Sequence, residues 1–109
     1  MAAAAQGGAT IYASGIEPGF AADHLVATLL TMSRRITSVR AQEIFLYDTY
    51  PVEFAMFDVF GFGKALDETP IMALPGVQAG TWGPVVEYVA AALGVTLDEI
   101  RETYERVPT

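Results

Sequence analysis

The chain has 109 residues, 52% of them apolar, a length and composition that fit one folded domain and exclude a disordered segment. Its formal net charge of −7 and its six basic residues argue against a surface for nucleic acid or an anionic membrane. Cysteine is absent, which excludes disulfides and thiolate chemistry, and no apolar run approaches the roughly 20 residues of a membrane span. We expect a single cytoplasmic domain covering residues 1–109.

The first eight residues combine an alanine run with the pair Gly7-Gly8. Alanine is the best helix former and a glycine pair favours the end of a helix. A helix this short is marginal unless it packs against another element. We therefore interpret residues 1–8 as the tail of a preceding helix.

A turn rich in glycine and proline, residues 14–20, follows a short β-like run at 10–13. Gly15 and Gly19 can adopt backbone angles closed to other residues, and Pro18 fixes its own φ. The next helix is predicted for residues 20–35, and its N-terminal amides would favour an anion or another acceptor. Local chemistry alone favours an ordinary connection between strand and helix.

One histidine, His24, lies on this helix beside its apolar stripe. No second histidine, cysteine or nearby carboxylate stands at a spacing suited to metal ligation, so no metal site is predicted. We interpret His24 as a structural or solvent-facing residue.

Residues 36–47 carry the strongest strand pattern, with β-branched and aromatic residues and a two-residue alternation. Both faces are mixed, and Arg40, Gln42 and Glu43 lie in the middle. Pairing across a half-solvated sheet is the favoured interpretation of these polar residues. A row that faces a ligand is the alternative.

A helix predicted at 52–60 follows a helix-start signal at 48–51 and is apolar almost all round. Such a helix is either a central core element or is covered by another subunit, which makes a homo-oligomer an expectation. The candidate interface residues are Phe54, Met56, Phe57 and Phe60.

The remainder is predicted as a loop over 61–81, part of which is functional, locally helical near 71–74, or mobile. A helix over 85–93 that ends at Gly94 follows. Thr96 and Glu99 match a capping box that would start a last helix running to about residue 106. The predicted fold is therefore α+β, with a few-stranded sheet packed against about four helices.

Motifs for common chemistries are missing. The sequence holds no G-x-S-x-G elbow, P-loop, HExxH or EF-hand pattern. Residues 61–66 fail the dinucleotide fingerprint, because Leu66 stands where the third glycine is required and a helix precedes the stretch. The catalytic residues stay unassigned from these patterns.

Four stretches together resemble a known group of oxidoreductases. The chain is similar, from about Gly8 to Val107, to dihydrodipicolinate reductase-like proteins, close to 2,4-diaminopentanoate dehydrogenase and NAD(P)H-dependent amine dehydrogenases. The turn is the most specific of the stretches that carry the likeness: 12–20 (YASGIEPGF), 42–45 (QEIF), 50–54 (YPVEF) and 82–86 (WGPVV).

The resemblance implies that the turn lies beside the nicotinamide and the substrate, in a substrate and oligomerisation domain that follows a Rossmann domain. By position, the site residues that it implies are Ser14, Gly15, Glu17, Pro18 and Gly19. Related amine dehydrogenases usually have asparagine where this chain has Glu17. A carboxylate there could pair with an amine or iminium substrate, but it donates no hydrogen bond unless protonated.

The resemblance also implies that the chain is a fragment, because no strand–GxGxxG–helix unit precedes the turn. NAD(P)H would bind the missing Rossmann domain in cis, and we expect no tight cofactor binding and no turnover by this chain alone, which an NAD(P)H turnover assay tests. The alternatives are a non-catalytic domain that oligomerises and a small-ligand carrier with a pocket between 40–47 and the helices.

Overall fold

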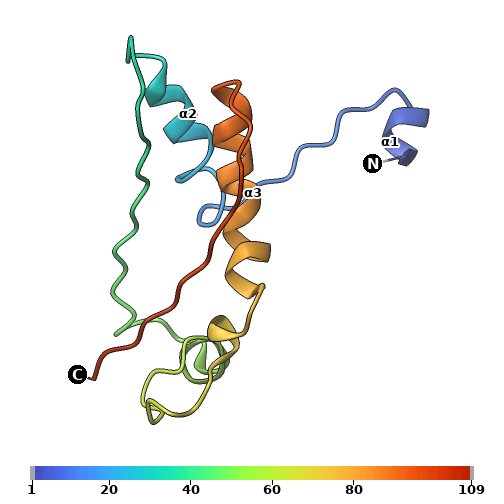
Figure 1. Cartoon of the computed structure of the whole chain (residues 1–109). Coiled ribbons are helices and arrows are strands. Elements are labelled where there is room, and N and C mark those ends of the chain that lie inside the picture. Colours follow the sequence, from blue (N-terminus) through green and yellow to red (C-terminus); the bar gives the residue numbers. More distant parts are fainter. Residues whose placement is uncertain (1, 109) are drawn as a thin grey trace.

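The computed structural model describes residues 2–108. In chain order its helices are α1 (Ala2–Gln6), α2 (His24–Leu30), the π-helix η1 (Ala55–Val59), the 3₁₀ helix η2 (Ile71–Ala73) and α3 (Val77–Ala92). Helix α3 packs against α2 and η2, and η2 contacts η1. Figure 1 shows α2 and α3 together, whereas α1 lies apart at the end of an extended N-terminal run.

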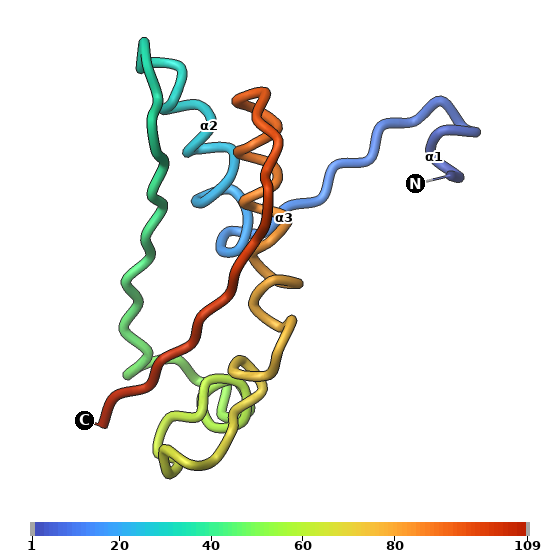
Figure 2. Tube along the Cα trace, in the orientation of Figure 1, coloured from blue at the N-terminus to red at the C-terminus, as the bar shows by residue number. Residues whose placement is uncertain are grey.

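No β-sheet forms among residues 2–108, so the predicted α+β fold is wrong. Pairing of the strand type is confined there to an isolated bridge between Ile16 and Gly19. The segments 36–46 and 96–108 run as extended chain (Figure 2), but no hydrogen bond between backbone groups joins either to a neighbour within the described residues. A strand needs a partner for its backbone donors and acceptors, and this part of the chain supplies none. The β-like run at 10–13 is likewise irregular.

Helix α2 is shorter than the predicted helix at 20–35. It starts at His24 because the Asp23 side chain accepts a hydrogen bond from the His24 amide and caps the helix. Near its end, the Thr31 hydroxyl donates to the carbonyl of Thr28 at 2.7 Å. Side-chain hydroxyls that bond to nearby carbonyls compete with the helical ladder, which accounts for an early stop.

Helix α3 is longer than the predicted helix at 85–93 and contains Pro84 within it. It begins after Gly76, whose φ of 83° is left-handed, so the predicted loop over 61–81 ends early. Of the alternatives for that loop, a local helix near 71–74 is the one that forms, as η2. The predicted stop at Gly94 is also confirmed, with a φ of 66° there.

The predicted last helix is absent, because residues 96–106 are extended. Its capping box does not form, and Glu99 pairs instead with Arg101 at 2.5 Å. Side chains farther along this segment bind the backbone of distant loops. Tyr104 donates to a carbonyl at 2.8 Å, and Arg106 donates to carbonyls at 2.7 and 2.8 Å. These long-range contacts replace the local bonds of a helix.

The helix predicted at 52–60 forms in part, as η1 and the residues just before it. The short helix expected in residues 1–8 is present as α1, although Met1 lies outside the described residues. None of the helices within residues 2–108 has both the length and the apolar character that crossing a membrane requires.

The apolar core is small. Ala90 is the one buried hydrophobic residue of the described chain, and Ile44 and Leu46 are 83% and 80% exposed. The radius of gyration is 17.1 Å, against about 13 Å for a compact domain of this length. The space between α2, α3 and the extended segments therefore remains as open cavities.

Candidate functional site

The turn at 14–20 is built from close backbone contacts that require glycine. A Cβ at Gly15 would lie 2.7 Å from the carbonyl oxygen of Pro18, and one at Gly19 would lie 2.4 Å from the carbonyl oxygen of Gly15. The φ of Gly19 is also positive, at 149°. The Glu17–Pro18 peptide bond is cis. The turn is therefore a compact loop that projects the Glu17 side chain from a fixed backbone.

The amides after the turn are not free for an anion. Phe20 and Ala21 donate to carbonyls of the turn at 2.9 and 3.0 Å, and Asp23 donates to the carbonyl of Gly19 at 2.8 Å. Asp23 then caps α2. The expectation of an acceptor site at this helix N-terminus is corrected, because the turn uses these donors itself.

Glu17 makes the most informative contact of the turn. Its Oε1 accepts a hydrogen bond of 2.7 Å from the indole Nε1 of Trp82 on α3. Both residues are half-buried, and none of the ion pairs formed among residues 2–108 includes Glu17. One carboxylate oxygen is thus held by a neutral donor, and the charge has no cationic partner in this part of the chain.

Glu17 and Trp82 line a cavity of about 720 Å³ between the turn, α2, α3 and the segment 41–45, called here the Glu17 cavity. Most of its walls are apolar, and the charged residues that line it are both acids, Glu17 and Glu43. Its lining residues are Ile16, Glu17, Ala21, Ala22, Leu25, Val26, Leu29, Ala41, Gln42, Glu43, Phe45, Trp82, Val85 and Val86. This volume is typical of small-molecule sites.

The other implied site residues lie near Glu17 without reaching the Glu17 cavity wall. Ser14 is exposed, and its hydroxyl donates to the carbonyl of Gly15 at 3.2 Å. Gly19 is buried and Pro18 half-buried, so these residues shape the loop. Of the five, Glu17 alone presents a side chain to the cavity.

Trp82 is not among the site residues expected from the sequence, where it stands only within the 82–86 stretch that carries the family resemblance. It is the single tryptophan of the chain, but it lies 65 positions from Glu17, a separation that no local pattern connects. Of the polar residues in the middle of 36–47, Gln42 and Glu43 line the Glu17 cavity and Arg40 does not.

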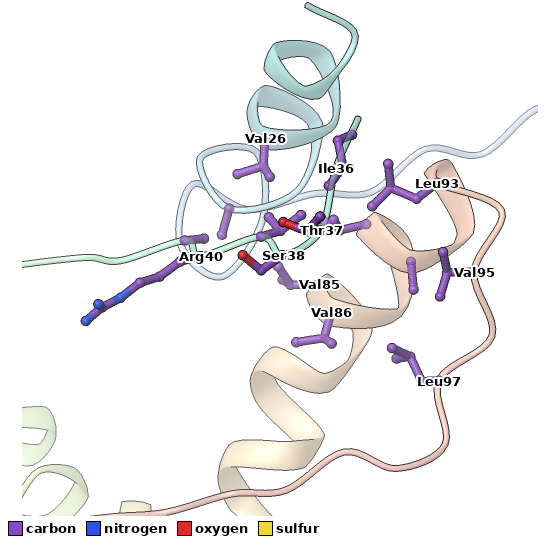
Figure 3. Close-up of a pocket in the computed structure, with 15 residues that line it drawn as sticks. Val26, Ile36, Thr37, Ser38, Arg40, Val85, Val86, Leu93, Val95 and Leu97 are labelled. Atoms are coloured by element: carbon purple, nitrogen blue, oxygen red, sulfur yellow. The ribbon is translucent and has the colours of Figure 1, made fainter. Parts of the chain in front are cut away.

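A second cavity, of about 610 Å³, adjoins the first and is called here the valine cavity. Figure 3 shows its side chains coming from α2, α3 and two extended segments, with the Arg40 guanidinium extending away from the labelled apolar groups. Its lining residues are Ala22, Val26, Ile36, Thr37, Ser38, Val39, Arg40, Ala41, Val85, Val86, Val89, Ala90, Leu93, Val95 and Leu97.

His24 belongs to a polar aromatic cluster, and it lines neither of these cavities. Its Nδ1 lies 3.0 Å from Oδ1 of Asp23, and its Nε2 lies 3.1 Å from the hydroxyl of Tyr88. Tyr12 stacks edge-on against the ring at 5.3 Å. The cluster joins the N-terminal run to α2 and α3, and no group of three or more metal-binding side chains occurs in residues 2–108.

The predicted interface residues divide into two kinds. Phe54 and Phe57 are 60% and 50% exposed, whereas Met56 and Phe60 are half-buried. Phe60 packs against Tyr47 with the ring centroids 4.9 Å apart. Burial, and then the nearby Glu43 carboxylate and Tyr50, raise the pKa of the Tyr47 hydroxyl above its usual value. The exposed part of this aromatic surface is the side of η1 that carries Phe54 and Phe57.

The chain is 40% identical, over 106 residues, to an amine dehydrogenase from Streptomyces virginiae. The sequence is thus amine dehydrogenase-like. The match covers 97% of this chain and 29% of that protein, so the chain spans less than a third of the length of this relative. No protein-family model and no solved structure matches the chain.

Proposed function

We propose that this chain forms the amine-binding part of an NAD(P)H-dependent oxidoreductase that acts on a small amine or imine. The proposal is carried by the hydrogen bond that fixes the Glu17 carboxylate at the wall of an apolar cavity. The likeness to the Streptomyces amine dehydrogenase supports the reaction class, and the glycine-proline turn supports a dihydrodipicolinate reductase-like relationship. Because the match covers less than a third of that relative, the activity of the whole protein is itself proposed.

Glu17 has the chemistry to hold a cationic nitrogen. Trp82 donates its hydrogen bond to one carboxylate oxygen, Oε1. The other oxygen, Oε2, can therefore accept a charge-assisted hydrogen bond from an ammonium or iminium group. Apolar walls reduce the screening of that pair by water. The fixed carboxylate therefore binds and orients the nitrogen-bearing end of the substrate.

The charge of the Glu17 cavity favours an amine without an acid group. No lysine or arginine is among the residues that line it, and Glu43 supplies a second carboxylate. The carboxylate of an amino acid would meet like charge there and find no cation to pair with. An uncharged or cationic substituent meets no such cost.

The described residues do not fit the dinucleotide cofactor. A pyrophosphate needs a glycine-rich turn between a strand and a helix N-terminus. Within residues 2–108, Gly61 and Gly63 follow η1 and lead into irregular chain, and the N-terminal amides of α3 bond to Glu102. We derive no hydride step from this chain, and we place the nicotinamide in a Rossmann domain supplied elsewhere in a longer protein.

The single tryptophan provides a direct test, because Trp82 contacts Glu17. Titration with cyclohexylamine hydrochloride is expected to change the intrinsic fluorescence of the 109-residue chain in a saturable way. Glu17→Gln should weaken that binding about 10- to 100-fold, the usual cost of losing a charged hydrogen-bond partner.

Two controls sharpen this titration. Glu68→Gln removes a carboxylate that does not line the Glu17 cavity and should leave the affinity for cyclohexylamine unchanged. Cyclohexanol has the same ring without the positive charge and should bind more weakly than the amine. Equal binding of the two ligands, or an unchanged affinity in Glu17→Gln, would refute the amine site and favour a small-ligand carrier.

A further inference from the structure

The Glu17 cavity and the valine cavity share a boundary. Five residues line both of them: Ala22, Val26, Ala41, Val85 and Val86. The boundary draws on α2 and the turn before it, on α3 and on the extended segment, and each of them contributes only alanine or valine side chains to it. The two spaces therefore meet where the side chains are short.

The chemistry changes from one end of this paired space to the other. The Glu17 cavity holds two carboxylates and an amide, Glu17, Glu43 and Gln42, whereas the valine cavity is lined mainly by aliphatic groups. Arg40, the one charged residue of the valine cavity, extends away from the apolar groups (Figure 3). A ligand that follows both spaces would be cationic at one end and apolar along its length.

From this continuity we infer the substrate class, an inference that rests on the proposed function: the ligand is an amphipathic primary amine. Its ammonium group pairs with Glu17, and its apolar chain crosses the boundary between Ala22, Ala41 and Val86 into the valine cavity. Val86 lies on this boundary and is 43% exposed, so its side chain is open to contact by a ligand. Contact with Val89 and Leu93, which line only the valine cavity, then distinguishes long amines from short ones.

Chain length gives the measurement. Each methylene buried from water adds about 0.8 kcal/mol, which corresponds to an affinity gain of about 4-fold. Calorimetric titration of the chain with straight-chain primary amines, from propylamine to octylamine, is expected to show this gain through the longest members. A plateau at butylamine would overturn the inference, because it would mean that the ligand ends in the Glu17 cavity.

Val86→Phe tests the path at the boundary. The larger ring should reduce the affinity for octylamine to that for butylamine, while the affinity for propylamine stays within about 2-fold of the original. Val107→Phe makes the same substitution outside both cavities and should keep the gain in affinity over the whole series of amines. An unchanged octylamine affinity in Val86→Phe would contradict the proposed path.

A measurement on the unmodified chain covers the case in which Val86→Phe does not fold. Octylamine should shift the methyl NMR signals of Val89 and Leu93, and propylamine should leave them in place. Signals that do not move with octylamine overturn the inference.

Glu17→Gln separates this inference from the proposed function. This substitution should weaken the binding of propylamine and of octylamine by the same factor, because both amines carry the same charged end. Octylamine binding that is insensitive to Glu17→Gln would show attachment through the tail alone and would overturn the inference. Glu17-dependent binding without a length dependence leaves the proposed amine site standing, and no binding of any amine rejects both.

Discussion

At the scale of single residues, the contact between Glu17 and Trp82 determines what the turn can do. Glu17 is half-buried, so an unbonded carboxylate would lose part of its hydration. The indole N–H at 2.7 Å replaces a water and selects one orientation of the carboxylate. Trp82 is therefore a positioning residue for the proposed amine-binding group.

Trp82→Phe should reveal this coupling, because it keeps an aromatic ring on α3 and removes only the donor and the indole bulk. We expect a lower free energy of unfolding, by about 1 kcal/mol, in urea denaturation followed by circular dichroism. In a double-mutant cycle with Glu17→Gln the two effects should be non-additive. Strictly additive effects would show that the indole contributes packing and no hydrogen bond.

At the scale of elements, α3 depends on a side chain from the far end of the chain. The Glu102 carboxylate accepts hydrogen bonds from the amides of Gly76 and Ala79. These donors are the orphan amides of the first helical turn, and a negative charge there also interacts well with the helix dipole. The bonds from Gly76 and then from Ala79 hold the pKa of Glu102 below its ordinary value of 4.5.

The lowered pKa predicts how stability depends on pH. The stabilisation by Glu102 is fully present above the unfolded value near 4.5 and is lost as the pH falls through the lower folded value. The thermal midpoint should therefore decrease on acidification, and Glu102→Gln should make that decrease smaller. Glu105→Gln, on the same segment, is the matched control and should keep the original dependence of the thermal midpoint on pH. The same dependence in the original chain and in both variants would show that Glu102 does not cap α3.

At the scale of the whole molecule, the chain leaves much of its apolar surface uncovered. The radius of gyration exceeds that of a compact domain, and Phe54 and Phe57 stand exposed at η1. Exposed aromatic patches of this kind are typical of protein interfaces. We propose that the η1 surface joins copies of the chain into a homo-oligomer.

Sedimentation velocity tests this assembly. The original chain should sediment as a dimer or larger species at high concentration, and Phe57→Ser should shift the population towards monomer. Val107→Ser changes another exposed apolar residue, 68% exposed, and should leave the assembly unchanged. If the original chain is monomeric at high concentration, the proposed homo-oligomer is wrong.

Local signals were reliable where a residue acts through its own backbone. Gly94 ends α3 because glycine accepts a left-handed φ, and a helical turn near Ile71 is one of the alternatives for the segment in which η2 forms. Patterns that depend on a neighbour failed. The alternation over 36–47 needed a partner strand, and the capping box at Thr96 competed with distant contacts made by the side chains that follow it.

The tight glycine-proline turn at 14–20, with an acid in it, follows from local sequence, because glycine reaches backbone angles closed to other residues and proline fixes its own φ. The contact of this acid with Trp82 appears only in the folded chain, since a separation of 65 positions leaves no periodic signal of the contact. The extended course of 36–46 and 96–106 also depends on the folded chain: no described segment pairs with the backbone of the first, and the side chains of Tyr104 and Arg106 bind distant backbone groups in the second.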